Sequence, residues 1–522
     1  MRQPCFRTVF TVGIYYRRFD KYNGRKGIGN MFENITPEQA GISSSHVLNF
    51  IKEIDQNGLF THSVIMARGD KIFSEVYYRP FDKDFKHRMY SVTTSFVGVA
   101  VGLAIEDGLL SLDDKFVKFF PEYLNENTTD YLREATIRDL LTMQSAVHTG
   151  RNWFIQNTDD RVKEYFVVPA DKIPGTVFEY DSNGSYMLGV IVEKLTGMKF
   201  LDYMRKKFLD AIGFSKDAYC LMAPGGYSFG DSAMMCTPRD LLLFARFVMN
   251  KGTWNGKRYM NEQYLTEATS RLVENSEMGI YGYDSFGYGY QIWQAPEGGF
   301  AFVGMGDQFA ICDPKHDFIF IINSDNQGNS ASRSVFYNAL YREIVHNLGE
   351  PLGENAAAYS ELCEYCNKCE LRHFEPKEYN PFEKKINNVT YELDENPMGI
   401  KKLSFSFEGK KGAMSYTNAQ GDKTLYFGMG YNEFGIFPED GYSDNIAGNP
   451  APGNKYRCAC SAEWSEEKKL RIQVQIIDKY FGNGCFTFSF KDSRITALMT
   501  ATAENFMMEY RGLANGRAAD FD

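Results

Sequence analysis

Two patterns of hydrophobic positions divide the chain near residue 355. Between residues 35 and 350, segments with apolar residues at helical spacing alternate with short apolar segments rich in β-formers. After residue 355, short strands take over, in which every second residue is apolar and Gly-rich turns intervene. Because 522 residues exceed the usual size of one core, the pattern predicts a domain over 31–350, a linker over 351–390 and a second domain over 391–522.

The first domain begins and ends with strand patterns. "HSVIMARGDKIFSEVYY" predicts a β-hairpin, and a helix is expected from Ser91 to near Gly108. Further helices are predicted in "TIRDLLTMQSAV", "SYMLGVIVEKLTG" and "TPRDLLLFARFVMNKG", and further strands in "YGYQIW", "FAFVG", "QFAICDP" and "DFIFIINSD". A hairpin at one end and strands at the other predict an α+β domain with one antiparallel sheet, assembled from both ends and flanked by helices.

In the second domain the sequence shows only strand patterns, in which apolar and polar residues alternate. Leu403, Phe405 and Phe407 share one face of a predicted strand, and Phe486 and Phe488 do so later in the chain. Regular short strands with one apolar face predict a small β-barrel or sandwich, and we expect a C-terminal β-barrel.

Composition and charge exclude some classes of partner. A net charge of −10 argues against nucleic-acid binding, which requires a basic surface. No apolar stretch is long enough to span a bilayer. The first 30 residues contain seven Lys and Arg residues against one acidic residue, but they lack the apolar stretch and the cleavage site of a signal peptide. We expect residues 1–30 to be a non-native or disordered extension, with the natural start at Met31.

Ten cysteines without a secretion signal indicate reduced thiols and a cytoplasmic protein. "CEYCNKCELRH" places Cys363, Cys366 and Cys369 at three-residue spacing before His373, and such spacing can bind metal. The alternative is a helix in which Cys serves as a small apolar residue, and we prefer it because structural zinc ligands normally come as two separated pairs. No metal or organic cofactor is expected.

Ser91 is the candidate nucleophile. It lies where a strand-like approach becomes a helix, so its hydroxyl lies near the N–H groups of a helix N-terminus, which favour a developing oxyanion. A serine hydroxyl also needs a base to take its proton. The residue one turn later on the same face is Thr94, which cannot accept a proton near neutral pH.

Two later segments carry further candidates. In "FEYDSNGSYMLG", Tyr180 and Ser182 alternate onto one side just before a helix, and a tyrosine can act as a base when a cation lowers its pKa. "FVGMGDQFAICDP" is a Gly-rich strand edge, whose backbone can approach a substrate closely and donate to an oxyanion.

The three segments in this order resemble the serine β-lactamase and penicillin-binding-protein superfamily. They are most similar to class C β-lactamases and the related esterases and D-amino-acid peptidases. The likeness covers about residues 35–350 and includes "LLTMQS", "DSAMMCTPRDLLLFARFVMNKGTWNGKRY" and "GYGYQIW". It implies a β-lactamase/transpeptidase-like fold and a serine hydrolase or acyltransferase that forms an acyl-enzyme with a small ester or amide.

The family pattern is Ser-x-x-Lys, Tyr-x-Asn or Tyr-x-Ser, and Lys- or His-x-Gly. By the resemblance, Ser91 matches the nucleophile, Tyr180 the tyrosine, Ser182 its partner, and Met305-Gly306-Asp307 the third motif. The N–H groups of Ser91 and Gln308 would then form the oxyanion hole.

The chain departs from this pattern where the family has cations. Thr94 replaces the Lys of the first motif, Met305 replaces the cation of the third, and Asp307 stands in place of Gly. Losing a general base costs about 10²–10⁴-fold in rate, roughly 3–5 kcal/mol of barrier. The candidate cations that could compensate are Arg88, Lys172 and His148.

Two functions therefore stay open. One is a hydrolase that forms an ester on Ser91, and the other is a catalytically impaired protein of the same fold that binds a small molecule. Each residue also has a structural alternative: Ser91 as a helix N-cap, Tyr180 as a core aromatic, Met305 as a packing residue, Asp307 as a turn cap, and His148 and His316 as surface or turn residues. The barrel would shape the pocket entrance or a homo-oligomer, or would simply fill its own core.

Overall fold

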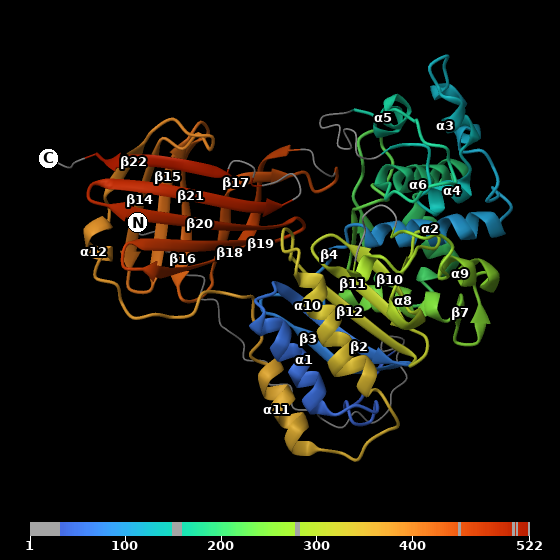
Figure 1. Cartoon of the computed structure of the whole chain (residues 1–522), viewed down its shortest axis with the longest axis horizontal. Coiled ribbons are helices and arrows are strands. Elements are labelled where there is room, and N and C mark those ends of the chain that lie inside the picture. Colours follow the sequence, from blue (N-terminus) through green and yellow to red (C-terminus); the bar gives the residue numbers. More distant parts are fainter. Residues whose placement is uncertain are drawn as a thin grey trace, which may run out of the picture.

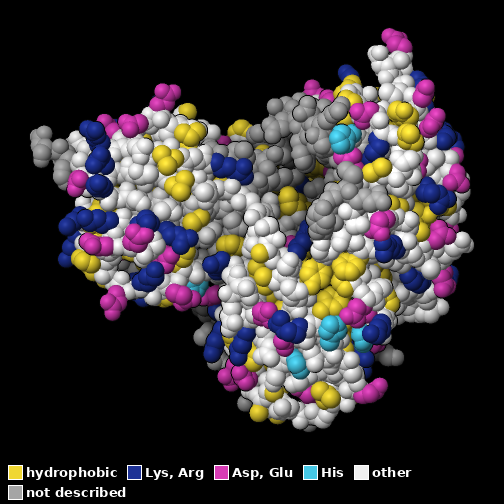
Figure 2. All heavy atoms as spheres, in the orientation of Figure 1, with side chains coloured by type: hydrophobic (Ala, Val, Ile, Leu, Met, Phe, Trp, Pro, Cys, Tyr) yellow, Lys and Arg dark blue, Asp and Glu magenta, His cyan; other side chains and the backbone are white. Residues whose placement is uncertain are grey.

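The computed structural model describes residues 32–148, 159–276, 282–446, 450–503, 507 and 510–519. The predicted extension over residues 1–30 lies outside the described residues. The described chain forms two lobes, with the first domain on the right and a barrel on the left of Figure 1. On the face shown in Figure 2, acidic and basic side chains are interspersed over both lobes.

The first domain is built on a seven-stranded sheet in which β1 pairs parallel to β3 and the other neighbouring strands pair antiparallel. The predicted hairpin forms β2 and β3, and β12 near the domain's end pairs with β2, so the two ends of the domain meet in one sheet, as predicted. In spatial order the strands are β1 (Glu33–Asn34), β3 (Lys71–Tyr77), β2 (Thr61–Arg68), β12 (Phe318–Ser324), β11 (Gln308–Asp313), β10 (Phe300–Gly304) and β9 (Trp293–Gln294).

Helices cover both faces of this sheet because its strands are apolar on both sides. Ala301 and Val303 of β10 pack with α1 and α10, whereas Phe300 and Phe302 pack with α2 and α8. The period of two along β10 thus divides the core into two layers. The helices of the first face are α1 (Ser44–Gln56), α10 (Ser332–Ala339) and α11 (Ala356–Cys366), and those of the second include α2 (Val92–Glu106) and α8 (Pro238–Met249).

A mainly helical region stands beside α2 and carries α6 (Figure 1). Helix α6 (Ser182–Thr196) ends at Gly197, which adopts φ 66°, and α8 begins with a capping box from Thr237 to Asp240, so both predicted helices are confirmed. The remaining helices of this domain are α3 (Asp130–Glu134), α4 (Ile137–Leu141), α5 (Arg161–Val167), α7 (Phe200–Met204) and α9 (Glu262–Ala268). Its short strands are β4 (His87–Arg88), β5 (Tyr219–Cys220), β6 (Met234–Cys236), β7 (Thr253–Trp254) and β8 (Lys257–Arg258).

Two predicted elements are shorter than expected. The helix predicted in "TIRDLLTMQSAV" ends at Leu141, because Met143 takes a left-handed conformation with φ 59°. In the predicted strand "YGYQIW", only Trp293 belongs to a strand, because Gln291 has φ 60° and turns the backbone away from an extended path.

The second domain is a closed β-barrel, as predicted. Nine strands form a ring that closes where β16 pairs parallel to β18, and β17 pairs with β18 outside that ring. The strands are β13 (Thr390–Leu393), β14 (Lys402–Glu408), β15 (Lys411–Asn418), β16 (Gly421–Met429), β17 (Glu433–Tyr442), β18 (Pro450–Glu466), β19 (Lys469–Ile477), β20 (Phe481–Lys491), β21 (Arg494–Ala503) and β22 (Gly512–Ala518), preceded by the short α12 (Glu383–Ile386). Phe405, Phe486 and Phe488 fill its core together with other inward-facing residues.

The segment between the domains is partly helical. Helix α11 packs against α1 of the first domain, and the chain then runs to the barrel. Within the described residues, no helix has both the length and the apolar character needed to cross a bilayer.

A buried aromatic contact joins the two lobes. The His62 and His87 rings lie 5.5 Å apart between centroids, and Phe481 of the barrel lies 4.8 Å from His62. Both imidazoles are buried, and burial lowers the pKa of His87 to about 3, with the Phe85 main chain opposing the change. The interface therefore holds neutral histidines.

We predict that His87 makes the protein less stable in acid. Unfolded His87 binds a proton below about pH 6.5, whereas the folded residue stays neutral down to about pH 3, so stability is lost as the pH falls through that window. Urea denaturation at pH 7, 5.5 and 4 should give a His87→Leu variant a shallower decline than the native protein, by roughly 1.4 kcal/mol per pH unit. The exposed His346→Leu serves as the control, and equal slopes for the native protein and His87→Leu would contradict the prediction.

Candidate active site

Ser91 lies at the start of α2 with its hydroxyl unused as a cap. Ser91 is the N-cap residue but has helical dihedrals, φ −65° and ψ −8°, and its side chain makes no capping hydrogen bond. The preceding Tyr90 has φ 47°, an uncommon conformation that is seen at functional sites. Ser91 is partly exposed, whereas Val92 and Thr94 after it are buried. The hydroxyl is thus placed at the surface of an otherwise buried helix start.

Tyr180 comes to Ser91 from the segment before α6. Its phenol faces the hydroxyls of Ser91 and Thr94, which oppose the effect of burial on its pKa. Burial is the larger effect and raises the pKa of Tyr180 above its ordinary value. Its Oη is buried without a hydrogen bond among the described residues, so both hydroxyls face it without hydrogen-bonding geometry. The Tyr180 ring stacks on Trp293, with centroids 5.5 Å apart.

A second phenol faces the position of the missing base. Burial raises the pKa of Tyr288, the nearby Tyr180 raises it further, and the Thr94 hydroxyl lowers it. The Tyr288 Oη is also buried without a hydrogen bond among the described residues. At the position where the family pattern has a lysine ammonium, the uncharged hydroxyls of Thr94, Tyr180 and Tyr288 therefore lie close together.

Gln291 explains why the "GYGYQIW" segment forms a tight loop here. Its Nε2 donates to the carbonyl oxygens of Leu140 (3.0 Å) and Leu141 (3.2 Å), and its Oε1 accepts from Ser185 Oγ at 2.6 Å. Its main-chain oxygen accepts from Ser95 Oγ at 2.7 Å. These bonds tie α2, α4 and α6 to the loop that carries Tyr288 and Trp293.

The third segment meets the first at Gly304, the last residue of β10. A Cβ atom at Gly304 would lie 2.4 Å from the Met89 carbonyl oxygen and 3.3 Å from the Val92 nitrogen. Only a glycine allows this approach, which brings the Met305–Asp307 turn beside the start of α2. The three segments singled out in the sequence thus converge in space.

Asp307 is turned toward α10. It is 4% exposed, and its Oδ1 lies 3.6 Å from Nε of Arg333, which also pairs with Asp284. Burial raises the pKa of Asp307, and Ser332 and Arg333 oppose the rise. Arg333 also lowers the pKa of Tyr180, although less than burial raises it. Sequence reasoning missed Arg333, because it lies in a helix outside the three segments and no local pattern marks it.

The other predicted residues of these segments also have defined places. Ser182 is the first residue of α6, next to Asp181, whose side chain caps the helix by accepting from Gly184 N at 2.8 Å. Gln308 begins β11 opposite Gly304, and its Nε2 donates to the Ser324 carbonyl. The role of Gln308 as an oxyanion donor stays a prediction.

The three candidate cations form bonds elsewhere. Lys172 Nζ lies 3.3 Å from Glu179 Oε2, and His148 Nδ1 lies 3.0 Å from the same oxygen. Arg88 is buried, donates to Ser232, and stacks over the Tyr90 ring. None of these contacts brings a cation to Ser91.

The cysteine segment is only partly helical. Cys363 and Cys366 lie in α11, whereas Cys369 follows its end.

His316 pairs with Asp313, at the end of β11 that is remote from Gln308. In the described part of the chain, no three His, Cys, Asp or Glu residues are grouped so that they could hold a metal ion.

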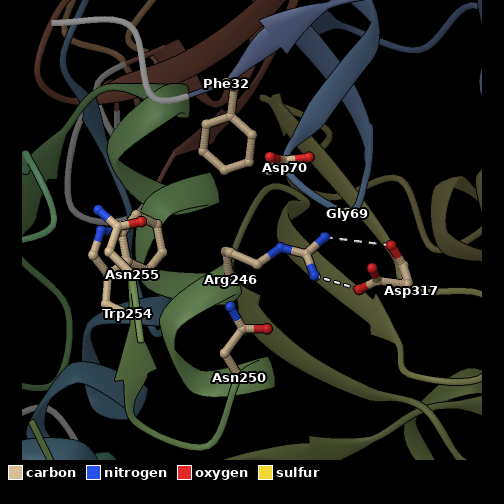
Figure 3. A pocket seen from close by; sticks show the side chains of 8 residues that line it. All are labelled: Phe32, Gly69, Asp70, Arg246, Asn250, Trp254, Asn255 and Asp317. Atoms are coloured by element: carbon tan, nitrogen blue, oxygen red, sulfur yellow. Dashed lines mark hydrogen bonds and ion pairs between the residues drawn. The ribbon is translucent and has the colours of Figure 1, made fainter. Parts of the chain in front are cut away.

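A polar cavity of about 320 Å³ lies at the opposite end of the strands (Figure 3). Gly69 and Asp70 of the β2–β3 turn line it, as does Asp317 before β12, which pairs with Arg246. The Gly304 end of the sheet carries the catalytic candidates, so this cavity is separate from them.

The first domain is similar to known proteins of one family. A family model described as Beta-lactamase matches residues 49–341. A 6-aminohexanoate-dimer hydrolase of Paenarthrobacter ureafaciens is 23% identical over 280 residues, which cover 50% of this chain and 71% of the relative. A lovastatin esterase of Penicillium rubens is 26% identical over 189 residues, covering 32% of this chain and 47% of the esterase.

A solved structure shares the fold of the first domain. A structure from Bacillus anthracis, provisionally assigned as a 6-aminohexanoate-dimer hydrolase, superposes with a TM-score of 0.51 at 19% identity. The match covers 61% of this chain and 87% of that one.

We predict that Gly304→Ala is destabilising. The added methyl group would overlap the Met89 carbonyl oxygen, so β10 and α2 must separate, at a cost of about 1–3 kcal/mol. Urea denaturation measures the loss. Gly435→Ala, on a barrel strand where a Cβ meets open space, is the matched control. If both variants were equally stable, β10 and α2 would not be in close contact.

Proposed function

We propose, from the premise that this chain belongs to the β-lactamase family, that it is a serine hydrolase that forms an acyl-enzyme on Ser91. The observation that carries the proposal is the meeting of the Tyr180 phenol with the hydroxyls of Ser91 and Thr94 at the start of α2. A nucleophile, a candidate base and a helix N-terminus are then combined in one site.

The proposed reaction begins with attack of Ser91 Oγ on the carbonyl carbon of an ester or amide. The phenolate form of Tyr180 takes the Oγ proton, and the carbonyl oxygen becomes an oxyanion. The Ser91 N–H stabilises that oxyanion together with a second donor from the β10–β11 region, for which the sequence predicts Gln308. Tyr180 then gives its proton to the departing alcohol or amine, and water or another acceptor repeats the sequence to release the acyl group.

Small esters and amides are the proposed substrates. The lovastatin esterase and the 6-aminohexanoate-dimer hydrolase among the similar proteins support this class. Met305 offers no charge to a substrate carboxylate, and Arg333, the cation that lies nearby, is paired with Asp284 and Asp307. We therefore propose substrates without a carboxylate beside the scissile bond, and we include transfer of the acyl group to an alcohol or amine.

One observation favours the second candidate, a non-catalytic binding protein. Burial raises the pKa of Tyr180, and its neighbours at Thr94 and Tyr288 are uncharged hydroxyls. A phenol in such surroundings is almost entirely protonated near neutral pH, so very little of Tyr180 is in the phenolate form that would act as the base. The following measurements separate slow catalysis from none.

We predict a covalent adduct on Ser91. Incubation with a fluorophosphonate or an activated ester, followed by intact-mass measurement, should add one acyl or phosphonyl group to the native protein. Ser91→Ala should remain unmodified, and Ser111→Ala, on an exposed turn, should react like the native protein. An unmodified native protein would rule out the enzyme and leave the binding protein.

We predict that Thr94→Lys speeds ester hydrolysis at neutral pH. Below its raised pKa, Tyr180 gains phenolate about tenfold per pH unit, so kcat/KM of the native protein should rise steadily from pH 7 to 9. An ammonium at position 94 lowers that pKa, which should raise kcat/KM at pH 7 by about 10²-fold and shift the rise to lower pH. Thr94→Val, which adds no charge, should show neither change. A slower Thr94→Lys variant would mean that the site is built around threonine.

A further inference from the structure

The barrel reaches the candidate active site through the first residues of β20. Phe481 packs in a buried cluster with Tyr90, the residue before Ser91, at 6.4 Å between ring centroids. Met305 of the third segment packs against the same cluster. A barrel residue thus belongs to a cluster that the first and the third catalytic segments both contact.

Two residues later, Asn483 makes the polar part of this contact. Its Nδ2 donates to Asp325 Oδ2 at 2.7 Å and to the Asp325 main-chain oxygen at 2.8 Å. Asp325 is 3% exposed, and its Oδ1 accepts from Gln327 Nε2 at 2.8 Å. Removing a partner from a buried carboxyl leaves that group unsatisfied, so Asn483 cannot be lost without disturbing this segment.

The segment around Asp325 holds the third catalytic segment in turn. Ser324 Oγ donates to the carbonyl oxygens of Gly306 (2.8 Å) and Asp307 (2.9 Å), and Asn326 N donates to Gly306 O at 3.1 Å. The segment 324–326 is therefore hydrogen-bonded to the barrel through Asp325 and to the turn beside Ser91 through the two residues that flank Asp325.

We propose that Asn483 is a positioning residue, through which the barrel fixes the Met305–Asp307 turn against the nucleophile. Asn483 acts through Asp325 and does not touch the substrate. The catalytic consequence rests on the proposed function, whereas the structural one does not. A displacement of about 1 Å at such a turn lowers a rate by up to about 10²-fold, because the donors no longer face the oxyanion.

Charge at this contact gives a sharper test than truncation alone. The pKa of Asp325 is raised to about 7, chiefly by burial, with Gln327 opposing the rise and the nearby Asp307 adding to it. Arg333 pairs with Asp307 from α10. A carboxylate introduced at position 483 would face Asp325 directly, so the two groups would share a proton at lower pH and repel each other at high pH, where both are deprotonated.

The first experiment compares Asn483→Ala with Asn515→Ala in the full chain. Asn515 is an exposed barrel asparagine that bonds to Thr496 within the barrel. Amide hydrogen exchange of the peptide covering residues 303–309 should be at least tenfold faster in Asn483→Ala than in the native protein. The kcat/KM for an activated ester should fall about 10- to 100-fold with KM little changed. Asn515→Ala should change neither quantity.

The second experiment uses the carboxylate. Asn483→Asp should be less active than Asn483→Ala above pH 8 and should recover relative to it below pH 6. The double variant Asp325→Asn with Asn483→Asp restores an amide–carboxylate pair and should regain activity at pH 8. Thermal melting of each variant identifies any variant that fails to fold. Amide hydrogen exchange is then compared only among the variants that fold.

The outcomes distinguish the two proposals. If native protein forms no Ser91 adduct but exchange at residues 303–309 still depends on Asn483, then the proposed function fails and the structural link stands. If Asn483→Ala folds and leaves both exchange and kcat/KM at native values, then the barrel does not position the turn and the inference is wrong.

Discussion

The close approach of β10 to the start of α2 is the constraint on which the candidate site depends. Gly304 has no side chain, and its backbone lies against the Met89 carbonyl and the Val92 nitrogen, on either side of the nucleophile. A main-chain contact of this kind cannot be replaced by longer side chains, because the turn that follows β10 must lie next to Ser91. The sheet and the α2 helix are therefore fixed to each other where chemistry is proposed.

The electrostatic character of the site follows from what surrounds that contact. Tyr180 and Tyr288 lie beside Thr94, and burial raises the pKa of both phenols. Among the described residues, Arg333 lowers the pKa of Tyr180 by its positive charge, and it is itself paired with Asp284 and Asp307. Surroundings of this kind disfavour a phenolate and a carboxylate ligand alike, which is consistent with the proposed neutral substrate.

The barrel contacts the segments that form this site. Phe481 packs in one apolar cluster with Tyr90, against which Met305 also packs, and Asn483 adds a polar contact to Asp325. The interface combines apolar packing with satisfied hydrogen bonds to a buried carboxyl, and both kinds of contact end at the catalytic segments. The two-domain arrangement thus bears on the site as well as on stability.

The sequence by itself determined the element types and the identity of the central hydroxyls. Side-chain period and capping are local properties, so helix α6 with its Gly197 stop, the β2–β3 hairpin and the alternating barrel strands could all be predicted. The turn at Gln291 could not be predicted, because the hydrogen bonds that hold it go to α2, α4 and α6, which are distant in sequence. Only the tertiary structure decided which charges lie near Tyr180 and what holds the third segment. Burial and charge proximity arise from residues such as Arg333 and Asn483, which approach only when the chain has folded.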